Sequence, residues 1–128
     1  MPFAQIHVTE GHSAEQKRVL IEKVTQAIQD AVGAPRPNVR VWIHALPTTD
    51  YGIGGSPVAE LDYNNAPFAQ LFLMEGRTEE QLRNLIALVC QALVEALDAP
   101  MDKVRAWITE VPKTNWGIAG KTAKDLGR

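Results

Sequence analysis

The sequence predicts an α/β protein of the α+β type, in which two tandem β-α-β units form a four-stranded sheet with two helices on one face. The first observation is an internal repeat: when the 128-residue chain is shifted by 65 residues, 27 of the 62 aligned pairs are identical without a gap. The second is that each copy passes from period-two alternation to helical spacing and back to a β-rich segment. The third is size, because a unit of about 60 residues is marginal alone and should share a core with its copy.

The repeat also predicts the domain organisation. We expect residues 1–128 to form a single domain of two units, 2–61 and 67–126, joined by a linker at 62–66 with the sequence Asp-Tyr-Asn-Asn-Ala. The repeat is too long for a solenoid unit, so the two copies should pack as one body.

Each unit opens with a strand and a helix. Residues 3–8 and their copy 68–73 have the pattern of a half-buried strand. Ser13 with Gln16, and Thr78 with Gln81, have the spacing of capping boxes, which begin helices. Apolar residues follow at helical spacing until the Ala-Pro pairs at 34–35 and 99–100, which end the helices.

A second strand closes each unit. Residues 39–45 and 104–110 are rich in β-branched and aromatic side chains. Because a helix connects it to the first strand, each should run parallel to that strand through a right-handed crossover. Gly-Ile-Gly-Gly at 52–55 and Gly-Ile-Ala-Gly at 117–120 predict turns or short hairpins.

The strands contain more large apolar side chains than the helix-covered face of the sheet can absorb. An exposed apolar sheet surface is typical of an interface, so we expect a closed homo-oligomer. The alternative is a monomer with a generous core. The residues that make up this surplus are Phe3, Trp42, Ile43, Phe68, Trp107 and Ile108.

Composition excludes several classes of protein. The net charge of -2 leaves no basic footprint for nucleic acid. No apolar run is long enough for a membrane span and no leader pattern is present, so we expect a cytoplasmic protein without a membrane partner. His7, His12 and His44 lack metal-ligand spacing, and the single cysteine, Cys90, is expected to be a buried small hydrophobe. We therefore expect no metal site.

The Met-Pro start is the strongest candidate for a catalytic group in the sequence. Methionine before a small residue is normally removed, which would leave Pro2 with a free secondary amine. An α-amino group has a pKa of about 8, and nearby cations or an apolar pocket lower this pKa. Such an amine can act as a general base at neutral pH. Taken alone, a Met-Pro start is also common in proteins where it has no catalytic role.

The motifs around Pro2 resemble the 4-oxalocrotonate tautomerase family, and they do so twice. The first unit has Pro2-Phe-Ala-Gln-Ile-His, Glu10-Gly, Ala34-Pro, Val39-Arg-Val and Gly52-Ile-Gly-Gly. The second unit has Pro67-Phe-Ala-Gln, Glu75-Gly-Arg, Asp98-Ala-Pro, Val104-Arg and Trp116-Gly-Ile. The whole chain thus resembles a fused tautomerase, with two family-sized units in one polypeptide.

The resemblance implies an activity and an assembly. The family catalyses keto-enol isomerisation of unsaturated 2-hydroxy or 2-oxo acids, such as 2-hydroxymuconate or phenylenolpyruvate, without a cofactor and with the N-terminal proline as base. Fused members form trimers equivalent to the hexamer of the short enzymes. A small unsaturated acid and a homotrimer are therefore the implied substrate and assembly.

The resemblance also implies the site residues. Pro2 is the base, and the arginine that follows the first strand and holds a distal carboxylate is Arg77. The arginine at the start of the second strand binds the proximal carboxylate, and both copies keep it, as Arg40 and Arg105. A neighbouring chain supplies this arginine in the family. The aromatic wall before Gly-Ile is Trp116.

The two copies differ in a consistent way. Pro67 lies within the chain, so its nitrogen is an amide without a basic lone pair. In the family the proline of one unit faces the arginine and the aromatic residue of the other, which implies that Pro2 faces Arg77 and Trp116. We therefore expect one live site per chain, although a protonated histidine in the other pocket could still bind an anion. That opposite pocket would hold Pro67, His12 and Tyr51.

Two other functions stay open. One is a hydratase-type dehalogenase or a decarboxylase on the same scaffold. Hydration needs a carboxylate, and the dehalogenases that resemble this chain have an acid in the Gly-Ile segment, where Ile53 and Ile118 stand here. The other is a trimeric binding protein with a vestigial pocket, which retention of Met1 would favour.

Overall fold

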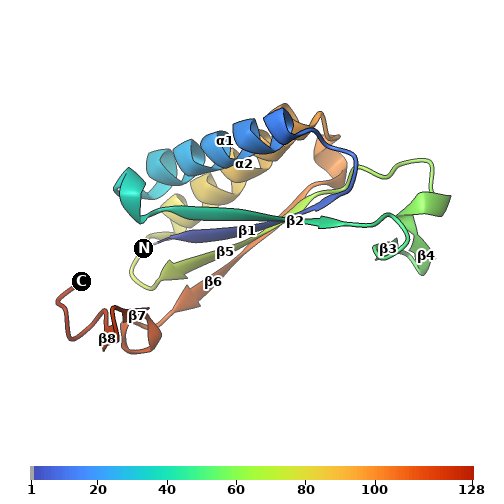
Figure 1. The fold of residues 1–128 in the computed structure, drawn as a ribbon. Helices are drawn as coiled ribbons and strands as arrows, with labels where there is room; N and C mark the ends of the chain where they lie inside the picture. Colours follow the sequence, from blue (N-terminus) through green and yellow to red (C-terminus); the bar gives the residue numbers. More distant parts are fainter. Residues whose placement is uncertain (1) are drawn as a thin grey trace.

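The computed structural model describes residues 2–128, so the predicted removal of Met1 concerns a residue outside the described part. Each unit is a strand, a helix, a second strand and a short hairpin (Figure 1). The first unit consists of β1 (Phe3–Thr9), α1 (Ala14–Val32), β2 (Arg40–Leu46), β3 (Gly52–Ile53) and β4 (Ser56–Pro57). The second consists of β5 (Phe68–Met74), α2 (Glu79–Leu97), β6 (Arg105–Val111), β7 (Gly117–Ile118) and β8 (Lys121–Thr122). Single 3-10 turns lie at Arg36–Asn38, Val58–Glu60, Met101–Lys103 and Lys113–Asn115.

The four long strands form one sheet in the order β2-β1-β5-β6. Within each unit the two strands are parallel, as a helical crossover requires. The units meet where β1 and β5 pair antiparallel, and there Gln5 lies opposite Gln70, its own repeat equivalent. A pseudo-twofold axis therefore relates the two units, and the predicted fold class is confirmed.

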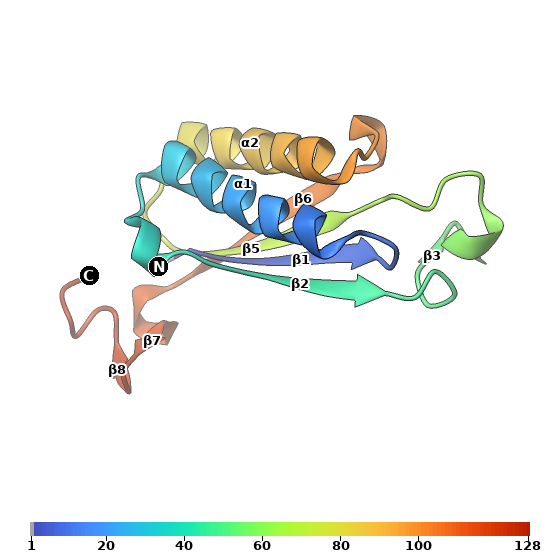
Figure 2. The ribbon, with the colours of Figure 1, turned by 45° about the horizontal axis from the view of Figure 1, so that its top comes forward.

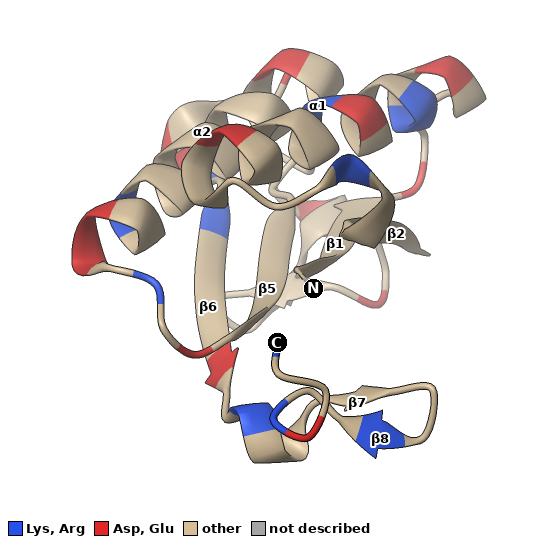
Figure 3. Ribbon diagram, turned by 90° about the vertical axis from the view of Figure 1, so that its left-hand side faces the viewer, with Lys and Arg blue, Asp and Glu red and all other residues tan. Residues whose placement is uncertain are grey.

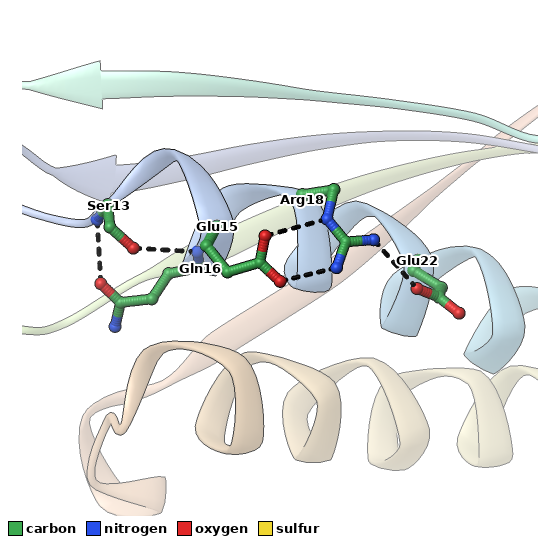
Figure 4. A network of polar contacts seen from close by, with 5 residues as sticks. All are labelled: Ser13, Glu15, Gln16, Arg18 and Glu22. Carbon is green, nitrogen blue, oxygen red and sulfur yellow. Dashed lines mark hydrogen bonds and ion pairs between the residues drawn. The ribbon is translucent and has the colours of Figure 1, made fainter.

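Both helices begin at the predicted capping boxes. The backbone N–H of Gln16 donates to Ser13 Oγ at 3.0 Å, and the N–H of Ser13 donates to the side chain of Gln16 at 2.9 Å (Figure 4). The same two bonds open α2 between Thr78 and Gln81. Each box satisfies backbone donors that the first turn leaves free, so the sequence itself determines where the helices start. At its other end, α1 stops at Gly33, whose φ of 69° is left-handed.

The two helices lie side by side on one face of the sheet (Figure 2), and α1 packs against α2. Alternate residues of the central strands point toward them and are almost fully buried. Both units contribute to a single cluster, as the size of each unit predicts. Its largest fully buried members include Ile6, Val8, Leu20, Val24, Ile28, Leu71, Leu73, Leu85, Val89, Leu93 and Leu97.

Among residues 2–128, no helix covers the opposite face of the sheet (Figures 1 and 2). The side chains of Trp42 and Trp107 remain 37% and 43% exposed there. Ile43 and Ile108 were predicted to belong to the apolar surplus. They pack against the helix-side core instead, because they alternate with the tryptophans along the edge strands. The surplus is therefore an aromatic face, made of Phe3, Trp42, Phe68 and Trp107.

Each glycine-rich segment forms a two-stranded hairpin, β3 with β4 and β7 with β8. After β8 the chain folds back in a tight turn. Ala123 is fully buried, and its N–H donates to the carbonyl of Trp116 at 2.8 Å. The N–H of Arg128 donates to the carbonyl of Ala123 at 2.9 Å. The last residues thus come to the end of the sheet at which β1 begins (Figure 1).

Within residues 2–128, neither α1 nor α2 has the length and apolar character that crossing a membrane would require.

We expect Leu93→Ala to lower the free energy of unfolding by about 2–5 kcal/mol, because truncating a fully buried side chain leaves a cavity. Leu88→Ala, on the same helix but 38% exposed, is the matched control and should cost less than about 1 kcal/mol. Urea denaturation at one protein concentration measures both, since dissociation of an oligomer makes stability concentration-dependent. Equal losses in the two variants would contradict this description of the core.

Candidate active site

Pro2 lies buried at the start of a central strand. Its carbonyl accepts a hydrogen bond from the N–H of Arg40 at 3.1 Å, which continues the parallel ladder between β1 and β2. Beside it is a cavity of about 200 Å³ that Pro2 lines together with Arg77 and Arg128. The structure therefore brings the predicted base and the predicted distal arginine into one cavity, although they come from different units.

Arg77 stands in the short loop between β5 and α2. The preceding residue, Gly76, has a φ of 117°, a conformation that favours glycine, and the following residue, Thr78, caps the helix. This turn holds Arg77 at the end of β5, next to the start of β1. No carboxylate of residues 2–128 forms an ion pair with Arg77. Its charge is therefore available to an anion in the cavity.

Trp116 lies in a groove next to the Pro2 cavity. It is 7% exposed, its ring centroid is 5.0 Å from that of Phe3, and it packs in a small cluster with Met74, which also lines the Pro2 cavity. The groove itself measures about 250 Å³ and is lined by Phe3, Phe72 and Trp116, among others. Trp116 thus reaches the neighbourhood of Pro2 through its contact with Phe3, without lining the same cavity.

Arg40 and Arg105 begin the two edge strands and are exposed. The guanidinium carbon of Arg40 lies 5.5 Å from the centroid of the Phe3 ring, so Arg40 is also close to the Pro2 end of the sheet. Arg105 donates from Nη1 to the carbonyls of Asp102 and Val104, both at 2.9 Å. Neither arginine forms an ion pair within the described chain.

The pseudo-twofold axis places a second pocket at the start of β5. The hydroxyl of Tyr51 donates to the carbonyl of Ala66, directly before Pro67, at 2.8 Å. Burial raises the pKa of Tyr51 above its usual value. The linker runs through this region, because Thr9 Oγ1 donates to the carbonyl of Asn64 at 2.8 Å. Linker backbone therefore takes up hydrogen bonds and space around Pro67.

A cavity of about 190 Å³ does open beside this linker, but its lining differs from that at Pro2. Lys103 Nζ stands 4.0 Å from the centroid of the Tyr63 ring, and Tyr51, Ala66 and Arg105 complete the wall. His12, the predicted third member of this pocket, does not line it. The structure thus brings Tyr51 to the residue before Pro67 and leaves His12 outside the cavity.

His12 is half-buried in the loop before α1. Burial lowers its pKa below the usual value, and the charge of Lys17 lowers it further. The uncharged imidazole is therefore favoured at neutral pH. Where the second unit has a permanent guanidinium at Arg77, the first unit has a neutral ring.

The remaining polar candidates have structural partners. His7 Nε2 lies 2.9 Å from Gln70 Oε1, and His44 Nδ1 lies 3.1 Å from Gln5 Nε2 on the open face. Cys90 is half-buried, where full burial was expected, and burial raises the pKa of its thiol. Across residues 2–128 there is no group of three His, Cys, Asp or Glu side chains that could hold a metal ion.

Sequence reasoning missed Arg128, which lines the Pro2 cavity from the end of the chain. In Figure 3 the last residues run back toward the start of β1. The repeat held no signal for it, since a shift of 65 residues places Arg128 on Tyr63, a residue of the predicted linker, and only the structure shows that Tyr63 lines the second cavity. The contact itself depends on the turn after β8, which no local pattern predicted.

Comparison with known proteins supports one family for both units. The family model described as "Tautomerase enzyme" matches residues 2–61 and again 67–126. A 2-hydroxymuconate tautomerase of Pseudomonas putida is 64% identical over 62 residues, a match that covers 48% of this chain and 98% of the relative.

Solved structures resemble the entire chain. A native fused 4-OT is 38% identical with a TM-score of 0.94, and the match covers 98% of this chain and 99% of that one. A fused 4-OT solved as an asymmetric trimer is 38% identical with a TM-score of 0.89 over the same shares of the two chains. These matches confirm the resemblance drawn from the motifs: the chain belongs to the tautomerase family of isomerases and consists of two tautomerase units in tandem.

Proposed function

We propose that this tautomerase isomerises unsaturated 2-hydroxy or 2-oxo acids of the 2-hydroxymuconate type, with Pro2 as its general base and no cofactor. The observation that carries the proposal is the cavity that Pro2 and Arg77 line together, in whose wall the described residues include no acidic side chain. The relatives that act on 2-hydroxymuconate by name support the choice of acid.

Removal of Met1 makes the nitrogen of Pro2 a secondary amine at the edge of this cavity. The amine accepts the proton of the substrate's 2-hydroxyl group and returns a proton to a carbon of the conjugated chain. Arg77 in the same cavity favours the unprotonated amine, because a second positive charge nearby is unfavourable. The same guanidinium stabilises the negative charge of the dienolate intermediate.

The arginines divide the binding work. Arg77 forms a bidentate contact with the distal carboxylate. Arg40 and Arg105 are exposed at the starts of the edge strands. In the proposed mechanism one of them binds the proximal carboxylate of a site in a neighbouring chain. Trp116, packed on Phe3, would wall the apolar side of an acid that extends from the Pro2 cavity into the neighbouring groove. A protein dipole or charge thus meets each charged group of the substrate.

We further propose that only the Pro2 site is active in each chain. The nitrogen of Pro67 is an amide and cannot accept a proton. The Tyr51 hydroxyl donates a hydrogen bond to the carbonyl of Ala66, the residue before Pro67, so the aromatic residue of the second pocket is held against the linker. His12, with its lowered pKa, supplies no permanent charge. Three separate features, one in the second unit and two in the first, thus argue against a second active site.

The assembly we propose is a homotrimer that covers the aromatic face. Two exposed tryptophans on a sheet without covering helices are a poor surface for a monomer in water. A fused relative of 38% identity was solved as a trimer. A trimer would also bring Arg40 and Arg105 of one chain to the sites of its neighbours.

For the base, we expect Pro2→Ala to keep the fold and an amine but to lower kcat/KM for 2-hydroxymuconate about 100- to 10,000-fold. Loss of the substrate's ultraviolet absorbance measures turnover, and circular dichroism checks the fold. Intact mass of the wild-type protein is the control, because a retained Met1 blocks the amine and favours a vestigial binding protein. A variant within a few-fold of wild type would reject Pro2 as the base.

For the asymmetry, we expect Arg77→Ala to lower kcat/KM for a dicarboxylate about tenfold to a hundredfold, the value of a charge-assisted contact. His12→Ala, at the equivalent position of the first unit, is the matched control and should change kcat/KM less than about threefold. Steady-state kinetics of both variants on the same acid decide the matter. Equal losses would mean that both pockets contribute.

For the assembly, we expect sedimentation at micromolar concentration to give three times the chain mass of 14.1 kDa. Introducing charge on the aromatic face with Trp107→Glu should shift the protein toward smaller species, because a buried carboxylate without a partner is costly. Asp125→Asn, an exposed change on the tail, is the control and should leave the mass unchanged. A wild-type monomer would contradict the trimer.

A further inference from the structure

The Pro2 cavity contains more positive charge than one distal arginine supplies. Arg77 and Arg128 both line it, and the other lining residues are uncharged. Among residues 2–128, neither guanidinium has a carboxylate within ion-pair distance. Two cations at one small cavity repel each other unless an anion lies between them, so the cavity has the charge pattern of an anion site.

A built turn, and not a loose tail, brings Arg128 to this place. Ala123 is fully buried under Trp116 and anchors the turn through its N–H. Leu126 donates to the carbonyl of Thr122 at 3.1 Å, and Arg128 donates to the carbonyl of Ala123 at 2.9 Å. These bonds hold the backbone of Arg128 at the mouth of the cavity.

Gly127 shapes the last step of this turn. Its φ of 70° lies in the left-handed region, which glycine adopts without strain. Its repeat equivalent is Asp62, at the start of the linker. The glycine at position 127 therefore lets the chain make this turn toward the cavity without backbone strain.

The first unit provides an internal comparison. The repeat equivalent of Arg128 is Tyr63, which lies under Lys103 and lines the second cavity. The same place in the fold thus carries an arginine at the cavity of Pro2 and a tyrosine at the cavity beside the amide proline. The two copies have diverged in chemistry at a position where the fold directs both toward a cavity.

We infer that Arg128 is a second carboxylate-binding residue of the Pro2 cavity and that, with Arg77, it selects conjugated dicarboxylic acids over monocarboxylic ones. The inference rests on the proposed function, because it places an acid in the Pro2 cavity. A dicarboxylate puts its distal charge between two guanidinium forks. A monocarboxylate of equal length puts an apolar end there and leaves both cations without a partner, which costs binding energy.

Equilibrium binding of two unreactive acids with carbon chains of equal length tests this directly. trans,trans-Muconate carries a carboxylate at both ends and sorbate at one end, and neither has the hydroxyl group that turnover needs. In isothermal titration, Arg128→Gln should weaken muconate binding about tenfold or more and sorbate binding less than about threefold. Lys124→Gln removes the same charge from the same turn outside the cavity lining and should change neither acid by more than about threefold.

The outcomes separate this inference from the proposed function. A wild-type protein that binds muconate no better than sorbate overturns the inference, as does an Arg128→Gln variant that weakens both acids equally. Equal losses in Arg128→Gln and Lys124→Gln would show general attraction of anions and overturn it as well. Turnover of 2-hydroxymuconate by the wild type, and its loss in Pro2→Ala, report on the proposed function whatever the titrations show.

Discussion

The antiparallel pairing of β1 with β5 is the constraint on which the site depends. Because the two strands run in opposite directions, the start of β1 lies beside the end of β5, and Phe3 pairs with Phe72. That register carries Pro2 to the loop that follows β5, where Gly76 turns the chain and Arg77 is held. The first unit alone has the strand, the helix and Pro2, but it lacks Arg77, which the second unit contributes across the β1–β5 pairing. The shared core makes the boundary between β1 and β5 rigid, since buried residues from both units pack in one cluster.

Joining the two units in one chain makes their pockets unequal even though the backbone is nearly repeated. The residue before Pro67 is covalently bound to it, so the linker has to enter the second pocket from the first unit. Two hydrogen bonds of 2.8 Å then hold the linker in place. The Tyr51 hydroxyl donates to the carbonyl of Ala66, and Asn65 Nδ2 donates to the carbonyl of Leu97. The fusion thus removes the basic nitrogen and places linker residues in the wall of the second cavity.

The two edges and the open face of the sheet connect the site to assembly. Because the two units are joined through their first strands, β1 and β5, the second strands β2 and β6 lie at the edges of the sheet. Exposed edge strands are sites where further chains add. Arg40 and Arg105 begin these strands, and Trp42 and Trp107 follow two residues later on the open face. Arg40 and Trp42, like Arg105 and Trp107, are two residues apart and therefore lie on the same face of the sheet. Under the proposed trimer, a change in the oligomer would also change the supply of Arg40 and Arg105 to the sites.

The sequence by itself determined the repeat, the β-α-β units, both capping boxes and the family, because these depend on local periodicity and on residues at constant spacing. It also named Pro2 and Arg77, which the structure brings to one cavity. Only the tertiary structure decided that Ile43 and Ile108 face the helices, that His12 stays outside the second cavity, and that Arg128 lines the first. Each of these depends on which face a residue takes or on a turn that joins distant segments. Such outcomes follow from packing across the whole chain, which no local pattern records.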